Sequence, residues 1–180
     1  MECDVAEIYA LWYEEGSPLY ELLRTHSALV AQKALDCAER HALDIDRRFV
    51  WEAAMLHDIG IFRTDAPGIL CNGTEPYIRH GVIGRELLDG LGLPRHALVC
   101  ERHTGAGLTV DDIIAQNLPL PYRDMVPIST EERLICYADK FFSKSGQFWK
   151  EKSLESVLRS MRKHGPETVC RFQAMHAEFG

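Results

Sequence analysis

Hydrophobic residues recur along nearly the whole chain at the three- and four-residue spacing of a helix face, rather than at the two-residue spacing of a strand. In the first segment, residues 4–14, such a face carries Val5, Ile8, Leu11 and Trp12. Capping residues and helix breakers lie between the segments. We therefore expect an all-α protein, a compact bundle of about seven to nine helices.

The caps and breakers predict where these helices begin and end. Ser17 as N-cap and Pro18 at the first position start a second helix that runs to about His41. Asp46 caps a third, which ends near Gly60, a residue suited to the left-handed conformation after a helix. Thr74 and Pro76 are expected to start the fourth helix, and a fifth that carries "RHALVCERH" follows "LGLP" (91–94). Thr109 and Asp112 cap a short sixth helix, and the seventh runs from Ser129 and Glu132 to about Phe142. Two C-terminal helices flank "HGP" (164–166).

Two stretches are predicted to have little regular structure. Residues 61–76 contain Pro67, Gly68 and Gly73, and residues 119–127 contain three prolines. Long loops in compact domains often carry function.

Length and composition limit the class of protein. The 180 residues, 46% hydrophobic and 26% charged, fit a single domain over 1–180. A net charge of −7 gives no basic field, so we expect no extended nucleic-acid surface. The acidic start and the lack of an apolar run of about 18 residues predict a cytoplasmic protein without a membrane segment. Its six cysteines form no CxxC pair and are expected to be free thiols.

Several ionisable residues lie on the apolar helix faces. His26 continues the face of Leu22 and Leu23, and His57 that of Ala53 and Ala54. A carboxylate beside it, Asp58, would cost several kcal/mol in an apolar helix unless paired with a distant arginine or bound to a metal. Three further polar residues on such faces are His80, His103 and Asp139.

The residue types favour a metal site over hydrogen-bonded core histidines. Imidazole nitrogen and carboxylate oxygen suit first-row metals such as iron, manganese, zinc or cobalt. The missing cysteine partners argue against a structural zinc site. Adjacent residues such as His57 and Asp58 can hold one ion and bridge to a second.

The order of these residues, with "HDIG" at 57–60, "RHTG" at 102–105 and "ADK" at 138–140, resembles the HD superfamily of metal-dependent phosphohydrolases over about residues 20–146. The resemblance implies an all-helical bundle with the N-terminal helix and C-terminal helices packed on this core. It implies that His26, His57, Asp58 and Asp139 bind a first ion. His80 and His103 match the extra histidines of binuclear members, in which the aspartate of the HD pair bridges both ions.

The implied reaction is hydrolysis of a phosphomonoester, phosphodiester or phosphoanhydride, of a nucleotide or other small phosphorylated metabolite, by metal-activated hydroxide. The cofactor would be one divalent ion or, in the preferred interpretation, two (Fe, Mn, Co, Ni or Zn, with Mg also compatible). Asp58, His80 and His103 are the candidate catalytic residues. Arg63, Arg102 and Lys140 are the candidates for substrate binding, and Arg63 is favoured because it lies in the loop after the motif. A homodimer is compatible with the sequence.

Three departures from the family pattern limit which substrate can be assigned. Binuclear relatives often carry lysine at the position of Ile61. The acidic pair of guanosine tetraphosphate hydrolases is missing, and no GYP motif follows "RHTG", so both of those activities are disfavoured. The alternatives are a di-iron oxygenase of HD type and a metal-containing nucleotide-binding or regulatory domain without turnover.

The other histidines and the tryptophans are assigned no role in the site. We expect His41, His96, His164 and His176 at the surface. Tryptophans 12, 51 and 149 are expected to be core or interface aromatics.

Overall fold

The computed structural model describes residues 3–147 and 149–180, so residues 1, 2 and 148 of the predicted domain lie outside the described residues. The expected all-α class is confirmed, since the described residues form nine α-helices and one pair of very short strands. The helices are α1 (Val5–Ala10), α2 (Pro18–Arg40), α3 (Arg47–Leu56), α4 (His80–Gly90), α5 (Pro94–Arg102), α6 (Val110–Ala115), α7 (Thr130–Asp139), α8 (Leu154–Met161) and α9 (Pro166–Phe179).

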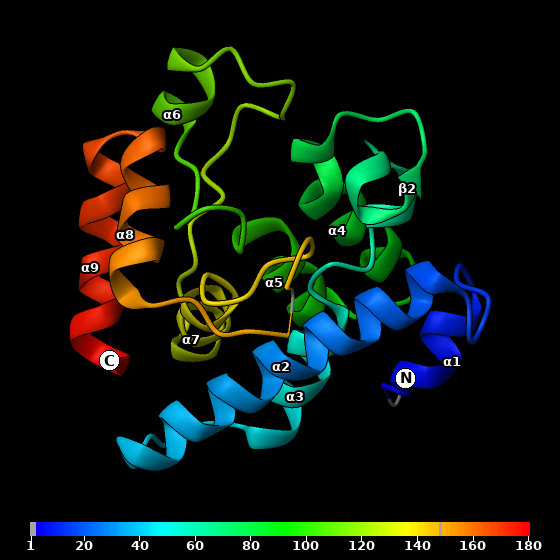
Figure 1. Ribbon diagram of the computed structural model, residues 1–180, viewed down its shortest axis with the longest axis horizontal. Helices are drawn as coiled ribbons and strands as arrows, with labels where there is room; N and C mark the ends of the chain where they lie inside the picture. Colours follow the sequence, from blue (N-terminus) through cyan, green and yellow to red (C-terminus); the bar gives the residue numbers. More distant parts are fainter. Residues whose placement is uncertain (1–2, 148) are drawn as a thin grey trace.

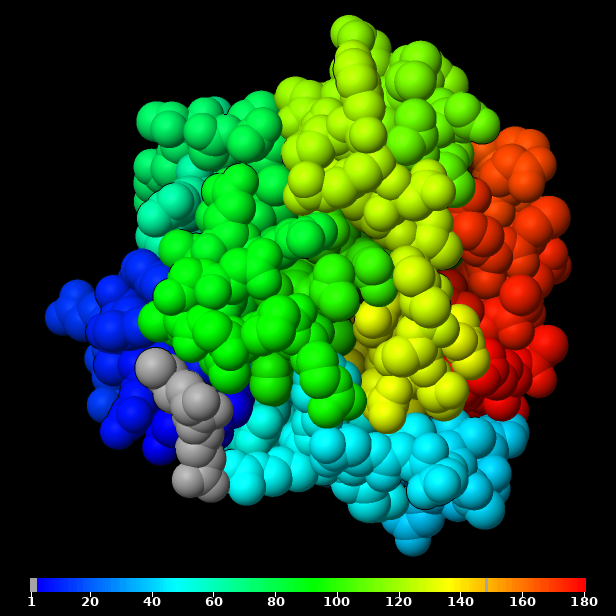
Figure 2. All heavy atoms as spheres, turned by 180° about the vertical axis from the view of Figure 1, so that it is seen from behind, coloured from blue at the N-terminus to red at the C-terminus, as the bar shows by residue number. Residues whose placement is uncertain are grey.

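The long helix α2 runs across the molecule and packs against α3 and α7 (Figure 1). In this view α8 and α9 lie side by side at the left of the molecule, and α4 and α5, which pack against each other, lie to the right of them (Figure 1). Seen from behind, the segment around α5, in green, covers the centre of the molecule (Figure 2). Apolar side chains of α2, α3, α7 and α9 form one buried cluster, and those of α1, α3 and α5 contribute to another.

The predicted caps start their helices as expected. Ser17 accepts a hydrogen bond from the amide of Tyr20, and Asp46 from that of Phe49. At Ser129 only half of a capping box forms. The Ser129 hydroxyl accepts from the Glu132 amide, whereas the Glu132 carboxylate accepts from Ile128 and from Arg102.

Three helices are shorter than their apolar patterns predict. The first ends at Ala10, the third at Leu56 and the seventh at Asp139. Near Leu56, distant side chains bind the backbone carbonyls: the Tyr9 hydroxyl donates to Met55, and that of Tyr13 donates to Ile59 at 2.8 Å. Carbonyls at a helix end need such partners when they are buried, and here the partners come from α1 and from the turn that follows it.

The role expected for Gly60 is wrong. Its φ is −83°, which is an ordinary right-handed value and not the left-handed conformation. Glycine is needed because a Cβ at this position would lie 2.3 Å from the His80 carbonyl oxygen and 2.6 Å from the Gly84 amide. The missing side chain lets the chain after α3 lie directly against α4.

The loop after α3 is more regular than predicted. It contains strands β1 (Asp65–Ala66) and β2 (Cys71–Asn72), paired antiparallel with Asp65 opposite Asn72. It also contains short 3-10 turns, η1 (Ile61–Arg63), η2 (Pro67–Ile69) and η3 (Tyr77–Arg79), and a fourth, η4 (Arg162–His164), follows α8. The amides of Thr74 and Glu75 donate to the Arg63 carbonyl, which closes the loop at its base. The fourth helix consequently begins at His80, later than the predicted start.

Several expectations about single residues are also decided. All six cysteines are free thiols, as predicted. His96 is buried rather than exposed, because its Nε2 lies 3.2 Å from a carboxylate oxygen of Glu52. Trp51 and Trp149 are 45% and 60% exposed, so they are not core residues. No helix among the described residues is long and apolar enough to cross a bilayer.

Candidate metal centre

Six buried side chains meet where five helices end or cross. Only His26 lies in the interior of a helix, α2. His57 and Asp58 directly follow α3, and His103 directly follows α5. The remaining two are His80, the first residue of α4, and Asp139, the last of α7. All six are at most 7% exposed.

Backbone carbonyls fix the orientation of three imidazoles. Nδ1 of His57 donates to the carbonyl of Ala54 at 2.6 Å, and Nδ1 of His103 to that of Cys100 at 2.7 Å. His80 repeats this contact with Tyr77, also at 2.7 Å. Each acceptor lies three residues earlier, where a helix or turn ends and its carbonyl is free. With Nδ1 engaged, the Nε2 atom of each ring faces the interior of the site.

Asp58 lies between two pairs of histidines. Its Oδ2 atom is 3.0 Å from Nε2 of His57 and 3.3 Å from Nε2 of His26. Its Oδ1 atom is 3.4 Å from Nε2 of His103 and 3.5 Å from Nε2 of His80. One carboxylate therefore offers a different oxygen to each pair, which is the arrangement of a bridging ligand.

Asp139 completes the first of these groups. Its Oδ1 atom lies 3.0 Å from His26 and 3.5 Å from His57. Its other oxygen pairs with Lys140 at 2.7 Å, and the Lys140 ammonium also donates to the His103 carbonyl. Lys140 thus orients Asp139 and ties α7 to the end of α5.

Burial and the two carboxylates set the charge of the site. Burial opposes ionisation of Asp58 and Asp139, but the charges of His57 and Lys144 at Asp58, and of Lys140 and Lys144 at Asp139, outweigh it and lower both pKa values well below the usual range. Burial also disfavours a charged His57, but Asp58 and Asp139 prevail and raise its pKa to about 9. At His80 burial prevails and lowers the pKa to about 3. The pKa of His103 is lowered for the same reason.

The buried atoms left without hydrogen bonds fit a metal ion. Oδ1 of Asp58 and Nε2 of His57 are fully buried, yet neither forms a hydrogen bond of acceptable geometry, and Oδ2 of Asp58 has only ion-pair contacts, the shortest with Lys144. Nε2 of His80 lies 3.1 Å from Nε2 of His103, close to the separation of about 3.0 to 3.4 Å expected for two ligands that each lie about 2.1 Å from one ion. Ligand atoms within 4.8 Å of one another fall into two groups: His26, His57, Asp58 and Asp139, and Asp58, His80 and His103.

The model of the HD domain matches residues 23–143, a span that contains all six of these side chains. The chain belongs to the HD domain family. HD domains form a superfamily of metal-dependent phosphohydrolases. The buried histidine and aspartate groups of this HD domain could therefore hold divalent metal.

Proteins from three archaea are similar to this HD domain. An uncharacterised protein of Methanocaldococcus jannaschii is 32% identical over 142 residues, 77% of this chain and 74% of that protein. Two proteins named tRNA (cytidine(56)-2'-O)-methyltransferase are 36% identical (Picrophilus torridus, 63% of this chain) and 32% identical (Thermoplasma volcanium, 92% of this chain). The matches cover only 28% and 44% of those two proteins. No solved structure gives a significant match.

The arginines predicted to bind substrate lie apart from the HD-domain ligands. Arg102 forms two contacts with the Glu132 carboxylate, at 2.8 and 3.1 Å. Arg63 is exposed, with its guanidinium 5.6 Å from the Phe62 ring centre. Neither lines the pocket beside the site, and Ile61 is fully buried in an apolar cluster.

Sequence reasoning missed Lys144, whose ammonium lies 2.6 Å from Oδ2 of Asp58. It aligned Tyr77 with His80 on one helix face but gave Tyr77 no role in the site, and the Tyr77 ring stacks on His80 with centroids 4.6 Å apart. A loop residue has no periodic pattern that reveals its direction, so the short distance in sequence between Lys144 and Asp139 was the only available signal.

A third group of possible ligands among the described residues lies away from this site. Cys3, Glu52 and His96 bring one ligand atom each to within 4.8 Å of the others. Arg48 already pairs with Glu52 at 2.7 Å, and His96 pairs with its other oxygen. This group is therefore a charge-balanced network without the unsatisfied atoms of the main site.

Proposed function

We propose that the protein is a metal-dependent phosphohydrolase with a binuclear centre that acts on a small phosphorylated substrate. The observation that carries the proposal is the placement of Asp58, with one oxygen toward His26 and His57 and the other toward His80 and His103. When bound, divalent ions would supply a nucleophilic water of lowered pKa and would stabilise charge on the phosphoryl oxygens.

The side chains of the protein would hold the ions and position the ligands. His26, His57 and Asp139 hold one side of the site, and His80 and His103 hold the other, with Asp58 shared. Lys140 acts as a positioning residue, since it binds Asp139 and the His103 carbonyl. His80 is a poor general acid, because a pKa lowered to about 3 leaves its ring neutral at neutral pH, with its one N–H on Nδ1 engaged by the Tyr77 carbonyl and no proton on Nε2. Its neutral Nε2 is suited to a ligand role.

Phosphate release tests the proposal. The purified protein, loaded with manganese, ferrous iron or cobalt, is offered a panel of phosphomonoesters, phosphodiesters and nucleotides. We expect release to fall by at least about 100-fold in the His57→Ala variant, since His57 is a proposed metal ligand. Release that is unaffected by His57→Ala would contradict the hydrolase proposal.

Metal analysis of the same preparations tests the number of ions. We expect two ions per chain in the wild-type protein, and one in a variant that lacks both His80 and His103. One ion in both proteins would indicate that these histidines bind substrate rather than a second metal ion. Oxygen consumption with ferrous iron and no phosphate release would favour the oxygenase, and metal binding with neither activity would favour a regulatory domain.

The proposal does not include the methyltransferase activity named for two of the similar proteins. The matches cover less than half of each of those proteins. The proposal rests on the six side chains of the metal centre, which are all present in this chain.

A further inference from the structure

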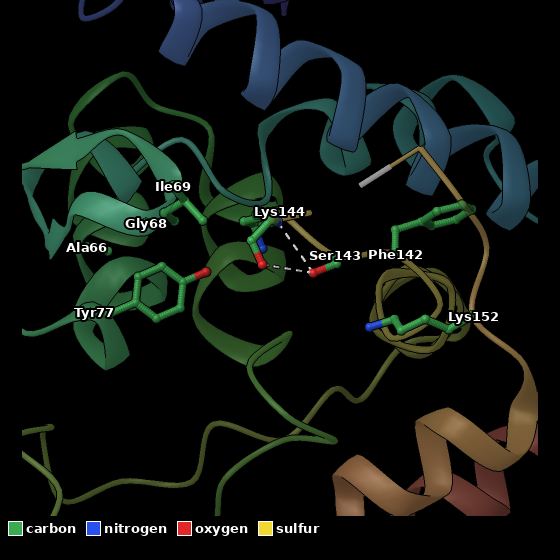
Figure 3. Close-up of a pocket in the computed structure, with 9 residues that line it drawn as sticks. Ala66, Gly68, Ile69, Tyr77, Phe142, Ser143, Lys144 and Lys152 are labelled. Carbon is green, nitrogen blue, oxygen red and sulfur yellow. Dashed lines mark hydrogen bonds between the residues drawn. The ribbon is translucent and has the colours of Figure 1, made fainter. Parts of the chain in front are cut away.

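A pocket of about 410 Å³ lies beside the metal centre, between two segments far apart in the sequence (Figure 3). One wall consists of the segment around Gly68 together with Tyr77. The loop after α7 forms the other wall, with Ser143, Lys144 and Lys152. The Tyr77 hydroxyl and the Lys152 ammonium both point toward the space between the walls (Figure 3).

Both walls touch the metal-centre residues directly. Lys144 pairs with Oδ2 of Asp58 at 2.6 Å, and the Tyr77 ring stacks on the imidazole of His80. A molecule in the pocket would therefore have its reacting end next to the shared aspartate. Ile61 supplies no charge there, because its side chain is a hydrocarbon, and it is fully buried.

The loop wall is positively charged in a protein whose net charge is −7. Lys152 is half-buried and forms no ion pair with any described residue. Burial lowers the pKa of its ammonium, and the charges of Lys140 and Lys144 add to this effect against the opposing Asp139. A partly desolvated cation without a partner, facing a pocket, is the expected partner of an anion.

The opposite wall is mostly apolar. Ala66, Gly68 and Ile69 line it, and Phe142 adds an aromatic ring from the loop side. A volume of about 410 Å³ is near the lower end of the range of about 300 to 1,000 Å³ for small-molecule sites. The pocket thus suits one organic group of moderate size attached to an anionic group.

We infer that Lys144 and Lys152 bind the phosphate of an organic phosphomonoester whose apolar or ring-shaped part packs against Ile69 and Tyr77. The inference rests on the proposed function and narrows its substrate class. Lys144 pairs with Asp58 in the metal-free protein, but a divalent ion held by Asp58 would take over that charge balance. The two ammonium groups would then match the two negative charges of a monoester phosphate, whereas a diester carries one. In the hydrolysis, water adds to phosphorus, the ester P–O bond breaks, and the leaving oxygen takes a proton to give an alcohol and inorganic phosphate.

Binding of two non-hydrolysable ligands tests the inference without turnover. Phenylphosphonate carries two charges at pH 8, and its methyl ester carries one on the same ring. Calorimetry with the manganese-loaded protein should show the dianion binding about 10-fold or more tightly than the ester. Equal binding of the two ligands would overturn the assignment to monoesters.

Three variants locate the binding site. Lys144→Met and Lys152→Met should each weaken phenylphosphonate binding about 10- to 100-fold, since each removes a charge-assisted hydrogen bond. Lys150→Met is the matched control, because Lys150 is exposed on the same loop and does not line this pocket, and it should bind like the wild-type protein. The manganese content of every variant is measured, so that loss of metal is distinguished from loss of the cation.

The outcomes separate the two proposals. Wild-type-like binding by Lys144→Met and Lys152→Met, with manganese retained, would overturn the inference even if the enzyme releases phosphate. Weakened binding in both variants, together with no phosphate release from any substrate, would support the pocket and contradict the hydrolase. Lys144→Arg retains a cation and should recover much of the binding, and recovery of the manganese content without recovery of phenylphosphonate binding would show that Lys144 serves only to balance Asp58.

Discussion

His57 carries a proton in the metal-free protein at neutral pH, because its pKa is about 9. The cause is local: Asp58 and Asp139 lie 3.0 and 3.5 Å from its Nε2 atom and outweigh the cost of burying the charge. The same atom is the one offered to a metal, so proton and metal compete for it. His80 has no such competition, since its pKa is about 3.

Metal affinity should therefore rise with pH. A pKa raised to about 9 means that the bound proton must be released below that pH, so affinity should increase by up to about tenfold per pH unit between pH 7 and 9 and then level off. Calorimetry with manganese in two buffers of different ionisation enthalpy would count the released protons. Constant affinity over this range, with no proton released at pH 7, would show that His57 is neutral or is not a ligand.

At the scale of elements, the ends of helices carry the site. The third helix ends at Leu56, where the Tyr9 hydroxyl of α1 and the His57 ring bind the carbonyls of Met55 and Ala54. The turn that follows can lie against α4 only because Gly60 has no side chain. This contact also places His80, whose carbonyl oxygen is the nearest atom to the missing Cβ.

Gly60→Ala should destabilise the protein by about 1–3 kcal/mol or more, since the backbone of α4 must move to admit the methyl group. Gly90→Ala is the matched control, because nothing lies within 4 Å of a Cβ there. Urea unfolding of both variants gives the comparison. Displacement of His80 should also lower the metal content of Gly60→Ala, and a midpoint equal to that of Gly90→Ala would contradict the packing argument.

At the scale of the whole molecule, the metal centre joins distant parts of the chain. Its ligands come from α2, α4 and α7 and from the ends of α3 and α5, so the site exists only when all five are assembled. Without metal, the charges of Asp58 and Asp139 are balanced by His57, Lys140 and Lys144. Metal should bind the folded chain far better than the unfolded chain and should stabilise it by mass action.

Saturating manganese should raise the Tm. At a free concentration 100 times the Kd, the gain is about 2.7 kcal/mol, which for a chain of this size corresponds to about 5 to 10 °C. Asp58→Asn should lose most of this increase, because it weakens the shared ligand. Scanning calorimetry with and without chelator measures the difference. An equal rise in Asp58→Asn would place the stabilising ion elsewhere, for example at Cys3, Glu52 and His96.

The sequence alone determined the helical class, the caps at Ser17, Asp46 and Ser129, and the six ligand candidates, because these depend on local periodicity and on the cost of burying charge. It could not determine where α3 and α7 end, since the partners of their last groups come from other helices. Nor could it show that Glu132 satisfies Arg102, or that Gly60 serves close packing rather than backbone conformation. Lys144 reaches Asp58, 86 positions earlier in the chain, only through the tertiary fold, since the direction of a loop side chain is set by what packs around it.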